Sequence, residues 1–166
     1  MRILAGIVIA ASLTTSAAAE LKVQFLEGAP KDRFVITNTG SCDLAAAQLL
    51  IDLSGSPYGL IFDVSGQGAG VEVFQPLEFT DGSQMLNKVP RVKDGDNQIL
   101  LDLKGLQAGE KVAFTIDIDD TADSREITVS NSEFLGAAVE LRTGATVARS
   151  AFDAKASAFL KEPNCS

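Results

Sequence analysis

The chain has 166 residues, enough for one ordinary domain, and its 46% hydrophobic and 22% charged residues are typical of a folded globular protein. It contains no histidine, which excludes a histidine-based catalytic triad, a histidine-ligated zinc site and a histidine pH switch. With 22 acidic and 14 basic residues, its net charge of -8 argues against nucleic acid and anionic membranes as partners, because binding to phosphate groups depends on cations.

The N-terminal segment has the three parts of a secretory signal peptide. Arg2 supplies positive charge, residues 3–13 are apolar, and three alanines precede a cleavage site before Glu20. We therefore expect residues 1–19 to be a signal peptide and residues 20–166 to form one exported domain, periplasmic or extracellular. The apolar run is too short to span a bilayer and no later run is apolar enough, so no integral membrane segment is expected after cleavage.

Most of the remaining chain alternates apolar and polar residues with the period of two that half-buried strands require. The clearest alternation is at residues 111–118, and similar runs lie at 21–25, 47–53, 60–64, 99–103, 127–129 and 137–141. Turns rich in Gly, Asp, Asn and Ser separate these runs. The pattern predicts a single antiparallel β-sandwich, immunoglobulin-like or jelly-roll-like, of roughly 8–11 short strands.

Three segments are less regular. Pro76 interrupts residues 71–79, which predicts an edge strand, a bulge or two short strands there. Residues 65–70 carry three glycines but lack the Lys-Ser or Lys-Thr of a phosphate-binding loop, which favours a flexible connection. Residues 144–160 fit either a helix or two short strands around a turn at 153–155, and we favour the hairpin because the rest of the chain is β.

The chain has two cysteines, Cys42 and Cys165. An even pair in an exported protein predicts a disulfide, which would join the C-terminus to a loop near the start of the fold. A catalytic or redox role is disfavoured, because the sequence has no C-x-x-C motif and no histidine to activate a thiolate.

An acidic run provides the strongest candidate site. Asp117, Asp119, Asp120 and Asp123 place four carboxylates within seven residues. The first two are expected on the solvent face at a strand end and the other two in the loop beyond. Calcium takes six to eight oxygen ligands, largely from carboxylates and carbonyls, so this run is a candidate calcium site. It is not an EF-hand, because Ala122 stands where that loop requires glycine, and a solvated turn is the alternative interpretation.

Asp94 and Asp96, in an Asp-Gly-Asp-Asn turn, form a second and weaker candidate for a cation site.

Two short segments, at residues 34–41 and 105–115, resemble strands and turns of bacterial immunoglobulin-like modules. Over most of its length the predicted mature chain also resembles a family of small exported alphaproteobacterial proteins labelled "aggregation factor core". That likeness is carried by residues 27–34, 70–76, 114–121 and 125–130. The resemblance implies adhesion or aggregation, and it brings no defined catalytic or ligand residues.

The sequence thus predicts an exported, non-enzymatic β-sandwich with calcium as its cofactor. The family resemblance implies that it acts in adhesion or aggregation, with itself or a cell-surface component as the partner. Two alternatives stay open. A small carboxylate-based hydrolase would need converging acidic groups in a pocket, and a periplasmic ligand-binding module would need a sizeable apolar cavity.

Overall fold

The computed structural model describes residues 18–28, 31–68, 70, 74–122 and 129–162. In that part of the chain the elements are, in order, β1 (Ala19–Leu26), β2 (Asp32–Asn38), β3 (Ala47–Asp52), β4 (Ile61–Asp63), β5 (Glu78–Asp81), the 3-10 helix η1 (Ser83–Met85), β6 (Gln98–Leu103), β7 (Lys111–Asp119), the 3-10 helix η2 (Asn131–Phe134), β8 (Ala138–Thr143), β9 (Thr146–Ala151) and β10 (Ser157–Glu162).

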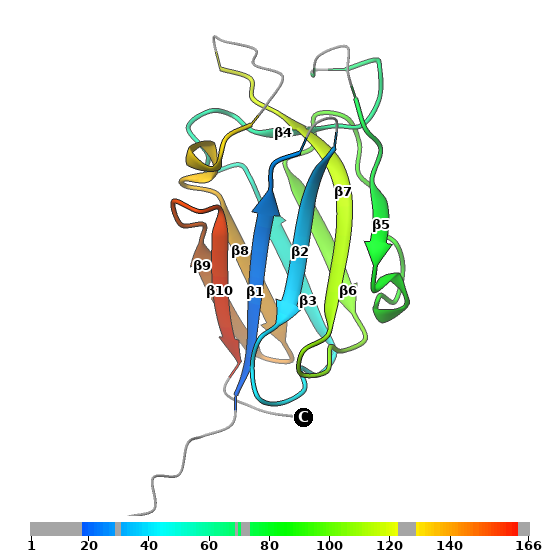
Figure 1. The fold of residues 1–166 in the computed structure, drawn as a ribbon, viewed down its shortest axis with the longest axis vertical. Helices are drawn as coiled ribbons and strands as arrows, with labels where there is room; N and C mark the ends of the chain where they lie inside the picture. The colour runs from blue at the N-terminus through cyan, green and yellow to red at the C-terminus, as the bar shows by residue number, and fades with distance from the viewer. Residues whose placement is uncertain (1–17, 29–30, 69, 71–73, 123–128, 163–166) are drawn as a thin grey trace, which may run out of the picture.

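The strands form two antiparallel sheets that pack face to face (Figure 1). One sheet has the order β10-β1-β2-β7-β4, with β5 also paired to β7. The other has the order β6-β3-β8-β9. The predicted all-β antiparallel sandwich is confirmed, and the ten strands of the described residues fall within the expected range.

Phenylalanines fill the space between the sheets. Phe34 of β2 contacts Phe114 of β7 and Phe134 of η2, with ring centroids 5.2 and 6.1 Å apart. Phe25 of β1 stacks on Phe134 at 4.2 Å, and Phe152 meets the same ring edge-on at 5.2 Å. Burial of these rings contributes strongly to folding. Strand alternation directs Phe25, Phe34 and Phe114 inward, whereas Phe134 comes from η2 and Phe152 from the residue after β9.

The segment before the C-terminus departs from the predicted hairpin. Two strands do flank a turn at residues 153–155, and no helix forms there. However, β9 pairs with β8 in one sheet, whereas β10 pairs with β1 in the other. The turn therefore carries the chain across the sandwich. Each strand instead pairs along its whole length with another partner: residues 146–151 with 138–143, and residues 157–162 with 19–24.

The structure also bears on the predictions made for residues 71–79 and for a strand at residues 127–129. Residues 78–81 form the edge strand β5, with a register shift between Phe79 and Asp81, while Pro76 stays outside the strand. The expected strand at residues 127–129 lies largely outside the described residues. Among the residues described, no helix has the length and apolar character needed to cross a membrane.

The ends of the domain lie near the first cysteine. The main-chain oxygen of Glu20 accepts a hydrogen bond from the Thr39 amide at 2.7 Å, and Glu20 pairs with Lys161 of β10 on its other side. The turn that contains Cys42 is therefore close to the end of β10. Cys165 lies outside the described residues, so the disulfide stays a prediction, and this arrangement supports it. The β1 strand begins at Ala19, next to the predicted cleavage site.

Candidate metal centre

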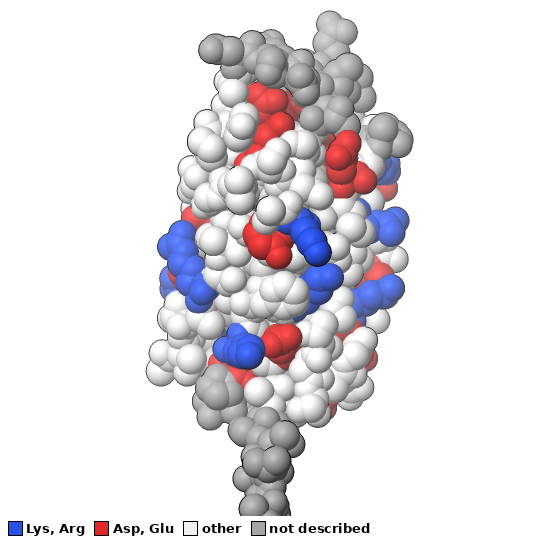
Figure 2. All heavy atoms as spheres, turned by 60° about the vertical axis from the view of Figure 1, so that its left-hand side comes forward, with Lys and Arg blue, Asp and Glu red and all other residues white. Residues whose placement is uncertain are grey.

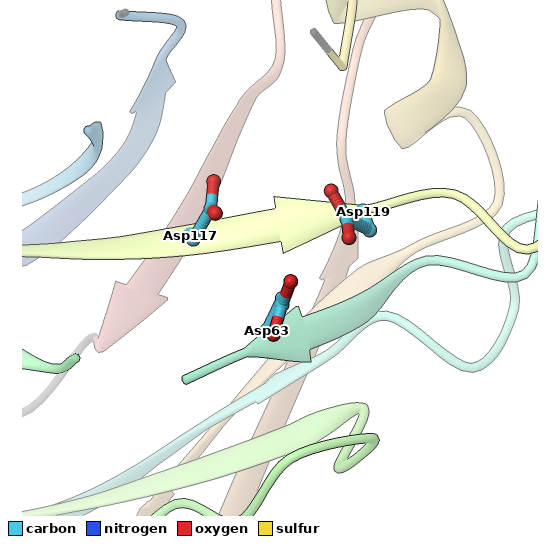
Figure 3. A group of neighbouring side chains, drawn as sticks. All are labelled: Asp63, Asp117 and Asp119. Carbon is cyan, nitrogen blue, oxygen red and sulfur yellow. The ribbon is translucent and has the colours of Figure 1, made fainter. Parts of the chain in front are cut away.

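Two neighbouring strands at one edge of the larger sheet carry three aspartates. Asp63 of β4 pairs directly with Asp117 of β7, and the next pair along the same face sets Ile61 opposite Asp119. Side chains two residues apart on a strand point to the same face, so Asp117 and Asp119 both stand beside Asp63 (Figure 3). One carboxylate oxygen from each of the three lies within 4.8 Å of the others.

The three carboxylates occupy the outer face of the sheet, yet they are buried. Phe62 and Ile118 point into the core, so the side chains between them point away from it. Even so, Asp63, Asp117 and Asp119 are only 0%, 8% and 2% exposed. The expectation that Asp117 and Asp119 face solvent is therefore wrong.

The segments after β4 and before β6 cover this face. The main chain at Gly70 lies against the Asp63 carboxyl group, and the Asp94 side chain accepts hydrogen bonds from the Val64 and Ser65 amides at 3.0 and 3.1 Å. Gly95 and Asp96 exchange main-chain hydrogen bonds with Phe62, which fixes the 94–97 turn along the free edge of β4. The alternation of apolar and polar residues in β7 could not predict this burial, because the residues that cover Asp117 and Asp119 come from elsewhere in the chain.

Asp63 is the least compensated polar group of the described residues. Both of its carboxylate oxygens are buried and have no hydrogen-bond partner. Burial, followed by contacts with the carboxyl groups of Asp94 and Asp119, raises the pKa of Asp63 to about 7. A buried carboxylate that lacks donors is costly, and such groups are usually paired or coordinate metals.

Two neighbouring aspartates, Asp117 and Asp32, also have raised pKa values. Burial and the charge of Asp119 raise the pKa of Asp117 to about 6. Asp32, the first residue of β2, has its pKa raised to about 7, mainly by burial, although a hydrogen bond from the Gly28 amide at 3.2 Å opposes the shift. The charge of Asp117 raises it further. This end of the sheet thus concentrates carboxyl groups where water is largely excluded and where their ionisation is disfavoured.

The geometry of the three aspartates suits a hard divalent cation. Calcium–oxygen distances are about 2.3–2.6 Å, so oxygens on opposite sides of one calcium ion are about 4.8 Å apart. The three oxygens fall within that limit. A cation among them would supply the charge that no described donor supplies to Asp63. The site is named here the Asp63 cluster, comprising Asp63, Asp117 and Asp119.

The remaining predicted ligands have different outcomes. Asp120 is buried but is outside the Asp63 cluster, and its Oδ1 accepts a hydrogen bond from the Ala122 amide at 2.9 Å. Asp123 lies outside the described residues. Of the weaker pair, Asp94 contacts Asp63, whereas Asp96 accepts a hydrogen bond from the Lys93 amide at 2.7 Å.

Sequence reasoning missed Asp63, the centre of the cluster. It appeared as an ordinary polar position of the run at 60–64. A signal was nonetheless present, because a lone carboxylate inside Leu60-Ile61-Phe62-Asp63-Val64 is flanked by apolar residues on both sides and precedes the glycine loop. Its partnership with Asp117 depends on the pairing of β4 with β7, which the sequence does not specify.

Comparison of the chain with protein-family models, with curated proteins and with solved structures finds no match.

Proposed function

We propose that this protein is an exported, non-enzymatic β-sandwich that binds calcium at the Asp63 cluster and acts in adhesion or aggregation. The observation that carries the calcium proposal is Asp63, whose two buried oxygens have no hydrogen-bond partner and face two further carboxylates. Calcium would neutralise the cluster and use these oxygens as ligands.

Calcium fits the cluster better than magnesium does. Magnesium requires a near-octahedral shell at about 2.0–2.1 Å and retains several waters, so it is usually bound by one or two carboxylates. The Asp63 cluster offers three carboxylates in a site with little exposed surface. Calcium tolerates irregular shells and sheds its water more readily, which suits such a site.

Burial also favours an ion over a substrate. A hydrolase would use the same raised carboxyl pKa values, but its acidic groups must touch the bond that they cleave. Asp63 and Asp119 are 0% and 2% exposed, so neither carboxyl group presents a surface to a sugar or a peptide. An open pocket of about 510 Å³, lined in part by Leu44 and Leu106, lies elsewhere on the described part of the protein.

The adhesive part of the proposal draws support from the family resemblance and from the surface. On the face shown in Figure 2, lysine and arginine side chains stand scattered among acidic ones and do not merge into one basic patch. That distribution suits contact with another protein better than contact with a polyanion. The outer face of the second sheet adds an exposed apolar side chain, Leu100 of β6, which is 47% exposed and lies opposite Leu50 of β3.

Beads coated with the oxidised protein test the adhesive role. We expect them to clump in millimolar calcium, disperse when a chelator is added, and stay dispersed in magnesium. Beads that carry Asp63→Asn are expected to stay dispersed in calcium, because the variant loses the central ligand.

Asp81→Asn provides the matched control for the bead experiment. Asp81 is outside the Asp63 cluster and forms an exposed ion pair with Lys111 at 3.2 Å. Beads that carry Asp81→Asn should therefore clump in calcium like the wild type. If wild-type beads stay dispersed although calorimetry detects bound calcium, adhesion through this site is wrong while the ion site stands.

A further inference from the structure

The smaller sheet ends in two edge strands, β6 and β9, and described residues cover only β6. Residues 85–87 lie along β6, where Leu86 bridges Leu103 and the Asn87 amide donates to the Asp102 carbonyl oxygen at 2.8 Å. At β9, on the margin of the sandwich in Figure 1, no described segment pairs on the side away from β8. An open edge strand offers its main chain to another strand.

One hydrogen bond identifies which main-chain groups of β9 face the open side. The Phe152 amide donates to the carbonyl oxygen of Ala137, the residue opposite it in the register of β8 and β9, at 3.0 Å. Hydrogen-bonded and non-hydrogen-bonded pairs alternate along an antiparallel ladder. Ala148 therefore bonds β8, whereas Val147 and Arg149 direct their N–H and C=O groups to the open side. Among the described residues, nothing else bonds these main-chain groups of Val147 and Arg149.

The β9 strand also lacks the features that usually protect an edge. Its six residues include no proline, no lysine and no acidic residue, and its register with β8 is continuous. Its one charged side chain, Arg149, extends over the sheet toward Asp52, with 3.9 Å between Nη2 and Oδ2. Val147, on the same face, is 57% exposed. The strand thus combines small side chains with a charge that is balanced within its own sheet.

A second copy of β9 fits this edge in antiparallel register. If a two-fold axis passes between the Ala148 residues of two copies, Val147 of each copy lies opposite Arg149 of the other, and their outward main-chain groups bond each other. The aliphatic part of the arginine then covers the valine, and Thr146 lies opposite Ser150, a pair that forms cross-strand hydrogen bonds. An axis at Arg149 would instead place two like charges directly opposite, which is unfavourable.

We propose that two copies of this protein associate by pairing their β9 strands, which joins their smaller sheets into one antiparallel sheet. The inference rests on the adhesive part of the proposed function and names a second copy as the partner. Its observations come from β9 and not from the Asp63 cluster, which lies on β4 and β7 of the other sheet. The interface is small, so the contact is transient in solution and gains strength where many copies share a surface.

Hydrogen exchange of the wild-type protein, followed by NMR in millimolar calcium, tests the pairing without any substitution. Raising the protein concentration should slow exchange of the Val147 and Arg149 amides at least several-fold. The Ala148 amide, which already bonds β8, should exchange at the same rate throughout and is the internal control. Equal exchange of the outward amides in dilute and concentrated protein would overturn the proposal and leave the edge to a strand of another protein.

Cysteine substitutions test the register. On the two-fold axis only residue 148 lies directly opposite its own counterpart, within the short distance between Cβ atoms that a disulfide requires. Mild oxidation should therefore link Ala148→Cys into a covalent dimer several-fold more efficiently than Val147→Cys. Equal linkage of the two variants would contradict the pairing.

Proline at an outward position tests whether this pairing is the adhesive contact. Val147→Pro removes an amide that β8 does not use, so the hairpin is expected to fold, but beads that carry it should stay dispersed in calcium. Val147→Thr is the matched control, because it keeps the amide and the branched side chain, and its beads should clump like the wild type.

The bead results separate the two proposals. If Val147→Pro beads clump as well, the role of β9 is overturned while adhesion stands. If wild-type beads stay dispersed although concentration protects the outward amides, the adhesive function fails while the pairing stands.

Discussion

Replacing Asp63 with asparagine is expected to stabilise the metal-free protein at about pH 8 and to abolish its response to calcium. The carboxylate of Asp63 is buried, has no donor, and has a pKa of about 7 against an ordinary 3.8. Each unit of that difference corresponds to about 1.4 kcal/mol, so ionising this group in the fold costs up to about 4 kcal/mol. An asparagine amide carries no charge and donates to the neighbouring carboxylates.

Thermal unfolding with and without calcium measures both parts of this prediction. At about a hundred times its dissociation constant, a ligand stabilises the wild type by about 2.7 kcal/mol, which raises Tm by about 5–10 °C for a domain of this size. Asp63→Asn should begin from a higher Tm in chelator and gain nothing from calcium. A variant that is less stable than the wild type in chelator and still responds to calcium would contradict the assignment of Asp63 as the central ligand.

The stability of the metal-free protein is expected to fall as the pH rises from about 4 to about 7. The pKa values of Asp32 and Asp63 are raised to about 7 and that of Asp117 to about 6. A raised carboxyl pKa means that the folded state holds a proton that the unfolded chain has lost. The corresponding stability is complete below the unfolded pKa, near 3.8, and is lost as the pH rises through the folded pKa.

Burial sets the sign of this effect, because it is the largest cause of the raised pKa of Asp32, Asp63 and Asp117. Neighbouring carboxylates reinforce it: Asp94 and Asp119 disfavour ionisation of Asp63, and Asp117 and Glu27 disfavour ionisation of Asp32. Asp153 acts in the opposite sense, because hydrogen bonds from the Ser157 and Lys155 amides lower its pKa, but its contribution is lost only below about pH 4. Between pH 4 and 7 the change in stability therefore comes from the carboxyl groups whose pKa is raised.

Saturating calcium should reverse the trend. The ion binds the ionised carboxylates, so its binding releases protons and its affinity should rise with pH across the same window. Denaturant unfolding at several pH values, in chelator and in calcium, provides the comparison. Metal-free stability that rises between pH 4 and 7 would show that these carboxylates are not held protonated in the fold.

Much of the fold could be predicted because local alternation determines which residues form strands. The run at 111–118 became β7, and its apolar members Val112, Phe114, Ile116 and Ile118 face the core as expected. Alternation says nothing about which strands pair. Hence the separation of β9 and β10 into different sheets, set by their partners β8 and β1, could not be predicted.

Two of the three residues of the Asp63 cluster could be predicted for the same reason. Asp117 and Asp119 were chosen because they stand close together in the sequence, and the structure retains both. Asp63 is brought in by pairing with a strand more than fifty residues away, and Gly70 and Asp94 cover it by tertiary contact. A side chain on the outer face of a strand becomes buried when another segment of the chain packs over it. The alternation of apolar and polar residues along the strand gives no information about such a segment.

The central claim is that the Asp63 cluster binds calcium, and differential unfolding of the wild-type protein tests it most directly. Oxidised mature protein is heated in a chelator, in millimolar magnesium and in millimolar calcium at about pH 7.5. The account predicts that Tm rises by about 5–10 °C in calcium and far less in magnesium. Identical Tm values in all three solutions would contradict it and would return Asp63, Asp117 and Asp119 to a purely structural role.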